Sequence, residues 1–351
     1  MPLPLILIGI AVVSGLFGAG SGVKAVVKNK EANDTNDAAR RVFDSAKEKL
    51  EKAKGCATLA LEEFGKQKIS TWTTQMADFE KVYSKIKNVK VGNRFSKDGF
   101  LPPSKDELLQ IKQHALNCQE ILSGGFSTLG AGALTGFGAY GGATMLATAS
   151  TGTAISTLSG VAATNATLAW FGGGSLAAGG LGMAGGAIVL GGLVSGPALL
   201  VGGLFMNSAA SKRLAMAEIN YYEAKKLAEE MNCATTSLDG IVEVVNQYAK
   251  LLKRLAGKML EANQSLAEII RQNGNDYRSY DLATKRRVLI STQMAQLLSG
   301  VLNTSVLTSS GALADDVQKK LEGMQNKMDG LTEDVQNKQE EMQNNMEEVF
   351  G

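Results

Sequence analysis

Few residues in this sequence could carry catalytic or metal chemistry. The 351-residue chain has one histidine, His114, and three widely spaced cysteines, Cys56, Cys118 and Cys233. A Ser/His/Asp or Cys/His arrangement would have to use His114, and its neighbours carry no such pattern. A structural zinc site needs clustered cysteine and histidine, which the chain lacks. We therefore expect a protein that is not an enzyme, with no catalytic residues, no cofactor and no metal site.

Other motifs that could bind a ligand are equally weak. The stretch GLFGAGSGVK (15–24) faintly resembles a phosphate-binding loop but fails the G-x-x-x-x-G-K-[ST] spacing. Acid pairs such as Asp315-Asp316 indicate solvated helix faces, and no basic patch with interleaved aromatic residues indicates nucleic acid. The odd number and wide spacing of the cysteines indicate reduced thiols and a cytoplasmic setting for the polar parts of the chain.

The charge is distributed very unevenly along the chain. The net charge is +2, yet no charged residue lies between Glu120 and Lys212, and this 91-residue interval holds 23 of the 40 glycines. A helix in water needs a polar face, whereas backbone in hydrocarbon is forced into helices. We therefore predict that residues 121–211 form a glycine-rich, membrane-embedded helical hairpin, with spans near 125–149 and 175–206.

Within this segment the sequence suggests three groups of functional positions. Pairs of glycines four residues apart predict close helix packing in a membrane; they are Gly132–Gly136, Gly138–Gly142, Gly182–Gly186 and Gly192–Gly196. Two aromatic residues suit a membrane interface, Trp170 and Phe171. Four polar residues could line a pore or satisfy backbone carbonyls inside packed helices, namely Thr157, Thr164, Asn165 and Thr167.

The N-terminal region 1–27 reads as a membrane anchor helix. Residues 3–23 contain no charge, and about 20 apolar residues span a bilayer. The first lysines, from Lys24 onward, follow the apolar run and place the N-terminus outside and the rest of the chain in the cytoplasm. A secretory signal would want its positive charge before the run. Alternatively, the stretch lies against other apolar helices without spanning.

The remaining chain is predicted to form helical arms. In the first arm (28–120), apolar residues recur at steps of three and four in two runs: Phe43, Ala46, Leu50, Ala53, Ala57, Ala60 and Phe64, and then Ile69, Trp72, Met76, Phe79, Tyr83 and Ile86. A second arm (212–310) repeats the pattern, from Tyr221 and Ala224 to Ala262, Leu266 and Ile269. An acidic coiled-coil tail (311–351) follows. We predict a capping box at Ser104, a break at 273–280 and a helix near 281–307.

These predictions combine into one fold class. The chain should be all-α: an elongated antiparallel helical bundle or coiled coil with a glycine-rich transmembrane helical hairpin and an N-terminal membrane helix. The arms are expected to fold back on one another because they have similar lengths and flank one hairpin.

The glycine-rich segment also resembles a known family. The run GAGALTGFGAYGGATMLATASTGTAISTLSGVAATNATLAWFGGGSLAAGGLGMAGG, preceded near the start by GLFGAGSGVKAVV, is similar to a widespread bacterial family of glycine-rich (glycine-zipper) membrane proteins. The resemblance covers about residues 1–260 and implies a bacterial membrane protein without an established biochemical role. The layout of an apolar hairpin between long helices is more loosely similar to α-helical pore-forming toxins of the cytolysin A type, which lack this N-terminal anchor and glycine content.

The sequence therefore predicts a non-enzymatic, membrane-integral helical protein that oligomerises and permeabilises the membrane as a pore-forming protein. The alternative is a membrane-anchored coiled-coil scaffold that recruits a cytoplasmic protein partner. The expected partners are the lipid bilayer and further copies of the chain, associated through coiled coils and glycine faces. The expected location is the bacterial inner membrane, with the polar arms in the cytoplasm.

Overall fold

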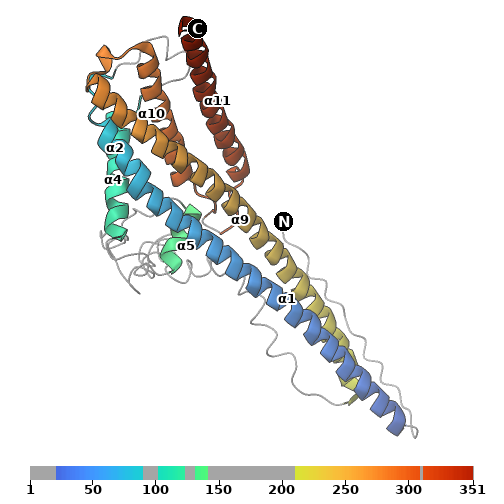
Figure 1. Cartoon of the computed structure of the whole chain (residues 1–351). Coiled ribbons are helices and arrows are strands. Elements are labelled where there is room, and N and C mark those ends of the chain that lie inside the picture. The colour runs from blue at the N-terminus through green and yellow to red at the C-terminus, as the bar shows by residue number, and fades with distance from the viewer. Residues whose placement is uncertain (1–20, 90–101, 123–130, 141–209, 309–310, 351) are drawn as a thin grey trace. The chain divides into compact units, whose positions relative to one another are not determined.

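The computed structural model describes residues 21–89, 102–122, 131–140, 210–308 and 311–350. The elements in these ranges are helices (Figure 1): α1 (Ser21–Thr71), the π-helix η1 (Trp72–Met76), α2 (Ala77–Tyr83), α4 (Lys105–Leu122), α5 (Ala131–Tyr140), α9 (Ala210–Asn273), the 3₁₀-helix η7 (Tyr277–Ser279), α10 (Leu282–Asn303) and α11 (Val317–Phe350). Extended pairing in these ranges is limited to two isolated β-bridges. The predicted all-α class is confirmed.

The chain forms two compact units. Unit 1 comprises Met1–Lys47 and Leu199–Glu230. Its described parts bury mainly alanines, which let helix backbones approach closely, at Ala32, Ala39, Ala46, Ala217, Ala224 and Ala228. Asn220 donates from Nδ2 to Oδ1 of Asn36 over 3.2 Å. Unit 2 comprises Glu48–Ala198 and Met231–Gly351, and it contains the features described below.

In unit 2, the two long helices α1 and α9 run parallel (Figure 1). Gln67 of α1 donates to the carbonyl of Ala249 over 3.1 Å, and further along both helices Asn263 donates to the carbonyl of Gln75 over 2.9 Å. The predicted antiparallel arrangement of the arms is therefore wrong. Antiparallel neighbours follow from a short connection, whereas here residues 84–209 separate α2 from α9, so the length of the connection does not require an antiparallel pair.

The buried seam of the first arm is confirmed almost residue by residue. Each predicted position from Phe43 to Ile86 is buried except Ala60, beside which Leu61 is buried instead. The regular spacing is interrupted once, by the step of five between Phe64 and Ile69. A π-helical turn at Trp72–Met76 adds a residue just after this step.

Helix α4 packs against η1 and α2. It begins with the predicted capping box: Ser104 N donates to Glu107 Oε2 over 2.7 Å, and Glu107 N donates to Ser104 Oγ over 3.1 Å. The side of α4 that faces η1 carries His114, whose ring meets the Trp72 ring edge to face with the ring centroids 5.0 Å apart. The single histidine is thus a half-buried boundary residue.

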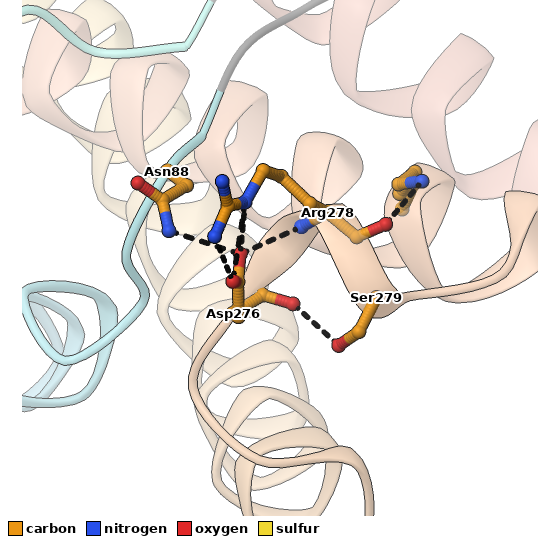
Figure 2. A network of polar contacts seen from close by, with 5 residues as sticks. Asn88, Asp276, Arg278 and Ser279 are labelled. Atoms are coloured by element: carbon orange, nitrogen blue, oxygen red, sulfur yellow. Dashed lines mark hydrogen bonds and ion pairs between the residues drawn. The ribbon is translucent and has the colours of Figure 1, made fainter.

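The break at 273–280 is a polar connector (Figure 2). The Asp276 carboxylate accepts hydrogen bonds from Asn88 Nδ2 at 3.1 Å and from the Arg278 guanidinium at 2.6–3.1 Å, and the Asp276 carbonyl accepts from Ser279 Oγ at 2.7 Å. The bonds to the carboxylate, those from Arg278 first and that from Asn88 second, hold the pKa of the Asp276 carboxyl well below its usual range. The connector joins the segment that follows α2 to the end of α9 through the parallel bridge between Lys87 and Asp276.

Helix α10 begins at an Asp281 N-cap, whose side chain accepts from Thr284 N over 2.7 Å. Buried residues are found on more than one side of this helix; they include Leu289, Thr292, Ala295, Leu298 and Leu302. The tail helix α11 packs on α9 and α10, with Tyr248 Oη donating to the Val317 carbonyl over 2.8 Å.

The membrane predictions are corrected by the composition of these helices. In the described part of the chain, no helix combines the length and the apolar character needed to cross a membrane. The apolar helix α5 has 10 residues, against about 20 for a span. This finding contradicts the predicted membrane-integral pore-forming protein, its membrane-anchored scaffold alternative and the inner-membrane location, and it leaves the transmembrane hairpin without support. Residues 1–20 of the predicted anchor (1–27), and residues 123–130 and 141–209 of the predicted hairpin (121–211), lie outside the described residues.

Candidate functional site

A lysine is completely buried at the junction of α1, α5 and the end of α10. Lys68 has 0% of its surface exposed, although lysine is almost never fully buried without a charged partner. Its Nζ donates to the carbonyl of Gly138 over 3.2 Å and to the carbonyl of Thr304 over 3.0 Å. These two bonds tie α1 to segments 70 and 236 residues away in the chain.

The two carbonyls lie at the C-terminal ends of helices. Gly138 is in the last turn of α5, and Thr304 is the C-cap of α10. The C-terminal end of a helix carries a partial negative charge, so both helix ends favour an ammonium group. The ring of Phe64 lies 4.5 Å from Nζ and adds a cation–π contact. Among the described residues, the contacts of Lys68 include no carboxylate.

Burial dominates the acid–base behaviour of this amine. Removal from water disfavours the charged form and lowers the pKa of Lys68 to about 7. The ammonium and the neutral amine are therefore both populated near neutral pH. Three hydrogens on the ammonium, or two on the amine, are enough to satisfy both carbonyls. Protonation thus changes the cost of burying the group without removing its hydrogen-bond partners.

Beside Lys68, α1 and α5 cross at two glycines. A Cβ added to Gly65 would lie 2.0 Å from the Leu134 carbonyl oxygen, and a Cβ added to Gly138 would lie 2.0 Å from the Leu61 carbonyl oxygen. Neither position can hold a larger residue unless the helices separate. This contact brings the Gly138 carbonyl within reach of Lys68.

The far end of α5 is held by backbone bonds. The carbonyl of Ala139 accepts from Val306 N over 2.7 Å and from Leu307 N over 3.1 Å. The side chains of Leu134, Phe137 and Ala139 are buried. A short apolar helix is thus fixed by a close helix crossing, by Lys68 and by the segment that follows α10.

The predicted site residues fall partly on this junction. Gly132, Gly136 and Gly138 lie in α5, and Gly138 makes its close contact with α1, a helix that carries many charged residues. The remaining predicted glycines, aromatic residues and polar residues lie outside the described residues; they are Gly142, Gly182, Gly186, Gly192, Gly196, Trp170, Phe171, Thr157, Thr164, Asn165 and Thr167.

Sequence reasoning missed Lys68 and Gly65. The signal was present in the seam, because position 68 is four residues after Phe64 and belongs to the buried stripe. The predicted stripe of apolar residues omits Lys68 and continues at Ile69, because a lysine is expected to face solvent. A charged residue at a regular seam position, three residues after a glycine and therefore on the same side of the helix, was the sign of a close and polar helix junction.

The junction offers no route to covalent or metal chemistry. A fully buried amine cannot reach a substrate, and within the described ranges no cluster of histidine, cysteine, aspartate or glutamate could hold a metal ion. Of the cysteines, Cys56 and Cys233 are exposed, while burial raises the pKa of the Cys118 thiol to about 12. The arrangement can control which elements pack together.

Comparison with protein-family models, with curated proteins and with solved structures gave no match. The resemblance to glycine-rich membrane proteins therefore stays a prediction.

Proposed function

We propose that this protein is a non-enzymatic, conformationally switched helical bundle. Its Lys68 junction docks α5, and with it the start of the charge-free segment 121–211, onto α1 and the end of α10. Acidification toward neutral pH weakens this docking, so that the segment is presented to a partner. The observation that carries the proposal is a completely buried lysine that bonds two helix ends and has no described counter-charge.

The direction of the pH effect follows from linkage. When α5 is released, Lys68 meets water and its pKa returns toward 10.5, whereas in the docked state its pKa is about 7. The released state therefore binds protons more strongly between these two values. Docking is strongest at alkaline pH, weakens as pH falls toward 7 and changes little below 7.

The described elements that face Lys68 across the junction bring few ionisable side chains close to it. The stretch 134–139 of α5 and residues 304–307 contain none. Across Phe64 lies Tyr248, with ring centroids 6.3 Å apart, and burial raises the pKa of this phenol to about 12. On α1, Lys66 faces outward and pairs with Glu62 and Glu63 at 3.1 and 2.7 Å.

Hydrogen exchange of the full chain tests the proposal. Peptides that cover α5 are followed by mass spectrometry from about pH 9 to about pH 7, with rates corrected for intrinsic exchange. We expect the free energy of protection of α5 to fall by up to about 1.4 kcal/mol per pH unit in the wild type.

Lys68→Met should abolish this pH dependence because the titrating group is gone. Lys66→Met is the matched control, since it removes a partly exposed lysine two residues away and should keep the wild-type dependence. Protection of α5 that is independent of pH in the wild type, or that depends on pH equally in Lys68→Met, contradicts the proposed switch.

A further inference from the structure

A second feature of unit 2 is a pocket of about 310 Å³ between α9, α10 and α11. Its apolar wall is formed by Ala262 of α9, Ile290 and Met294 of α10, and Leu331 of α11. The volume lies at the lower end of the range of small-molecule sites. At about 30 Å³ per water-sized group, the pocket would hold a ligand of about ten non-hydrogen atoms.

The pocket is elongated along α9 and α10. These helices are joined by the short connector 274–281, and Arg287 Nη2 donates to Ser265 Oγ over 2.7 Å, so the two helices run antiparallel. Ser265 and Arg287 therefore line one end of the pocket, and Lys258 and Met294 line the other. Seven residues of helix separate the two ends on each side, a rise of about 10 Å.

The polar groups at the two ends differ. At one end, Lys258 pairs with Glu261 over 3.0 Å, so the charges of this pair compensate each other. At the other end, Arg287 is exposed and forms no ion pair with the described residues. A guanidinium has five N–H donors, and the bond to Ser265 uses one.

Two carboxylates lie close enough to Arg287 to feel its charge, but both are engaged elsewhere. Glu268 pairs with Arg271 over 2.6 Å, and Asp281 accepts from the backbone N–H of Thr284 over 2.7 Å. The guanidinium therefore remains available to an acceptor in the pocket. A carboxylate fits the planar guanidinium fork through two parallel hydrogen bonds.

We infer that this pocket binds a small amphiphilic carboxylate. Its carboxylate accepts hydrogen bonds from the Arg287 guanidinium beside the Ser265 hydroxyl, and its apolar chain lies along Ala262, Ile290 and Met294. The lining residues carry two positive charges and one negative charge, so a monoanion matches the pocket. This site is independent of the Lys68 junction, which lies between α1, α5 and the end of α10.

The test uses the full chain labelled with ¹³C at its methionine methyl groups, with octanoate as the probe and octanamide as its neutral isostere. The Met294 methyl reports on the pocket, and Met294→Leu identifies its NMR signal among those of the 13 methionines. At about pH 7.5 the carboxyl group is ionised. We expect a saturable shift of the Met294 signal with octanoate, and binding of octanamide that is weaker by at least about tenfold, because the bonds to the guanidinium are charge-assisted.

Two variants sharpen the test. Arg287→Gln removes the cation from an exposed position and should reduce the preference for octanoate over octanamide to about one. Arg41→Gln is the matched control, since it removes an exposed arginine of unit 1 and should keep the wild-type preference. The comparison of the two probes in the wild type stands even if Arg287→Gln does not fold.

Three results would overturn the inference. Octanoate could leave the Met294 signal unchanged while it shifts other methionines, which would place it on other apolar surfaces of the chain. Octanamide could bind as tightly as octanoate, or a folded Arg287→Gln could keep the wild-type preference. Either of these results would show that the guanidinium does not hold the carboxylate.

Discussion

The close crossing of α1 and α5 can be tested by adding one methyl group. In Gly138→Ala, the new Cβ would lie 2.0 Å from the Leu61 carbonyl oxygen, 2.8 Å from its carbonyl carbon and 3.1 Å from its Cα. These are backbone atoms of a long helix, so they cannot rotate away as a flexible side chain would. The two helices must separate by about 1 Å to reach even the closest tolerable contact.

The cost follows from what this separation breaks. The bond from Lys68 Nζ to the Gly138 carbonyl is already 3.2 Å long and would be lost. A hydrogen bond to a charged group contributes about 1.5–3 kcal/mol and overpacking costs about 1–3 kcal/mol, offset by about 1 kcal/mol of better helix propensity for alanine. We expect Gly138→Ala to lower the free energy of α5 docking by about 2–4 kcal/mol.

Gly55→Ala is the matched control. A Cβ at Gly55 of helix α1 meets nothing within 4 Å, so this variant should be neutral or more stable by up to about 1 kcal/mol. Urea unfolding measures global stability, and hydrogen exchange of peptides covering α5 shows whether the loss is local. Gly65→Ala should reproduce the effect from the other helix, because its Cβ meets the Leu134 carbonyl oxygen at the same distance. Equal α5 protection in Gly138→Ala and Gly55→Ala would refute the close-crossing argument.

Three further predictions follow from the same structure. The free energy of unfolding should rise between about pH 7 and about pH 9 by up to about 1.4 kcal/mol per unit, because unfolded Lys68 binds more protons, and urea titrations of Lys68→Met should lack this rise. Asp281→Ala removes the N-cap of α10 and should cost about 1 kcal/mol in thermal or urea unfolding, whereas Asp281→Asn should retain most of it. In the native protein a thiol reagent should label Cys56 and Cys233 rapidly and Cys118 only on unfolding; rapid labelling of all three would show that the α4 face opens readily.

The helices and their buried faces could be predicted from sequence because their signals are local. The three-four spacing from Phe43 to Ile86 specifies which side of a helix avoids water, whatever covers it. The Ser104 capping box acts over three residues and forms as expected.

The direction of helix pairing could not be predicted in this way. A seam of buried residues has the same spacing whichever way its partner runs, so it does not distinguish a parallel from an antiparallel neighbour. The parallel pairing of α1 with α9 depends on the path of the chain between them. The described part of that path includes α4 and α5, which are held by contacts such as those of His114 with Trp72 and of Gly138 with Leu61.

The surroundings of the apolar helix α5 could not be predicted from the sequence either. Absence of charge around α5 indicates that its residues avoid water, but not what replaces the water. Reading the missing charge as a lipid environment led to the membrane predictions, whereas in the structure Leu134 and Phe137 are buried within the helical unit. The sequence by itself determined the helices, their buried stripes and their caps, since these depend on residues a few positions apart. Only the tertiary structure decided that Lys68 is buried between two helix ends and that Ser265, Arg287 and Leu331 line one pocket, because these groups are brought together from distant parts of the chain.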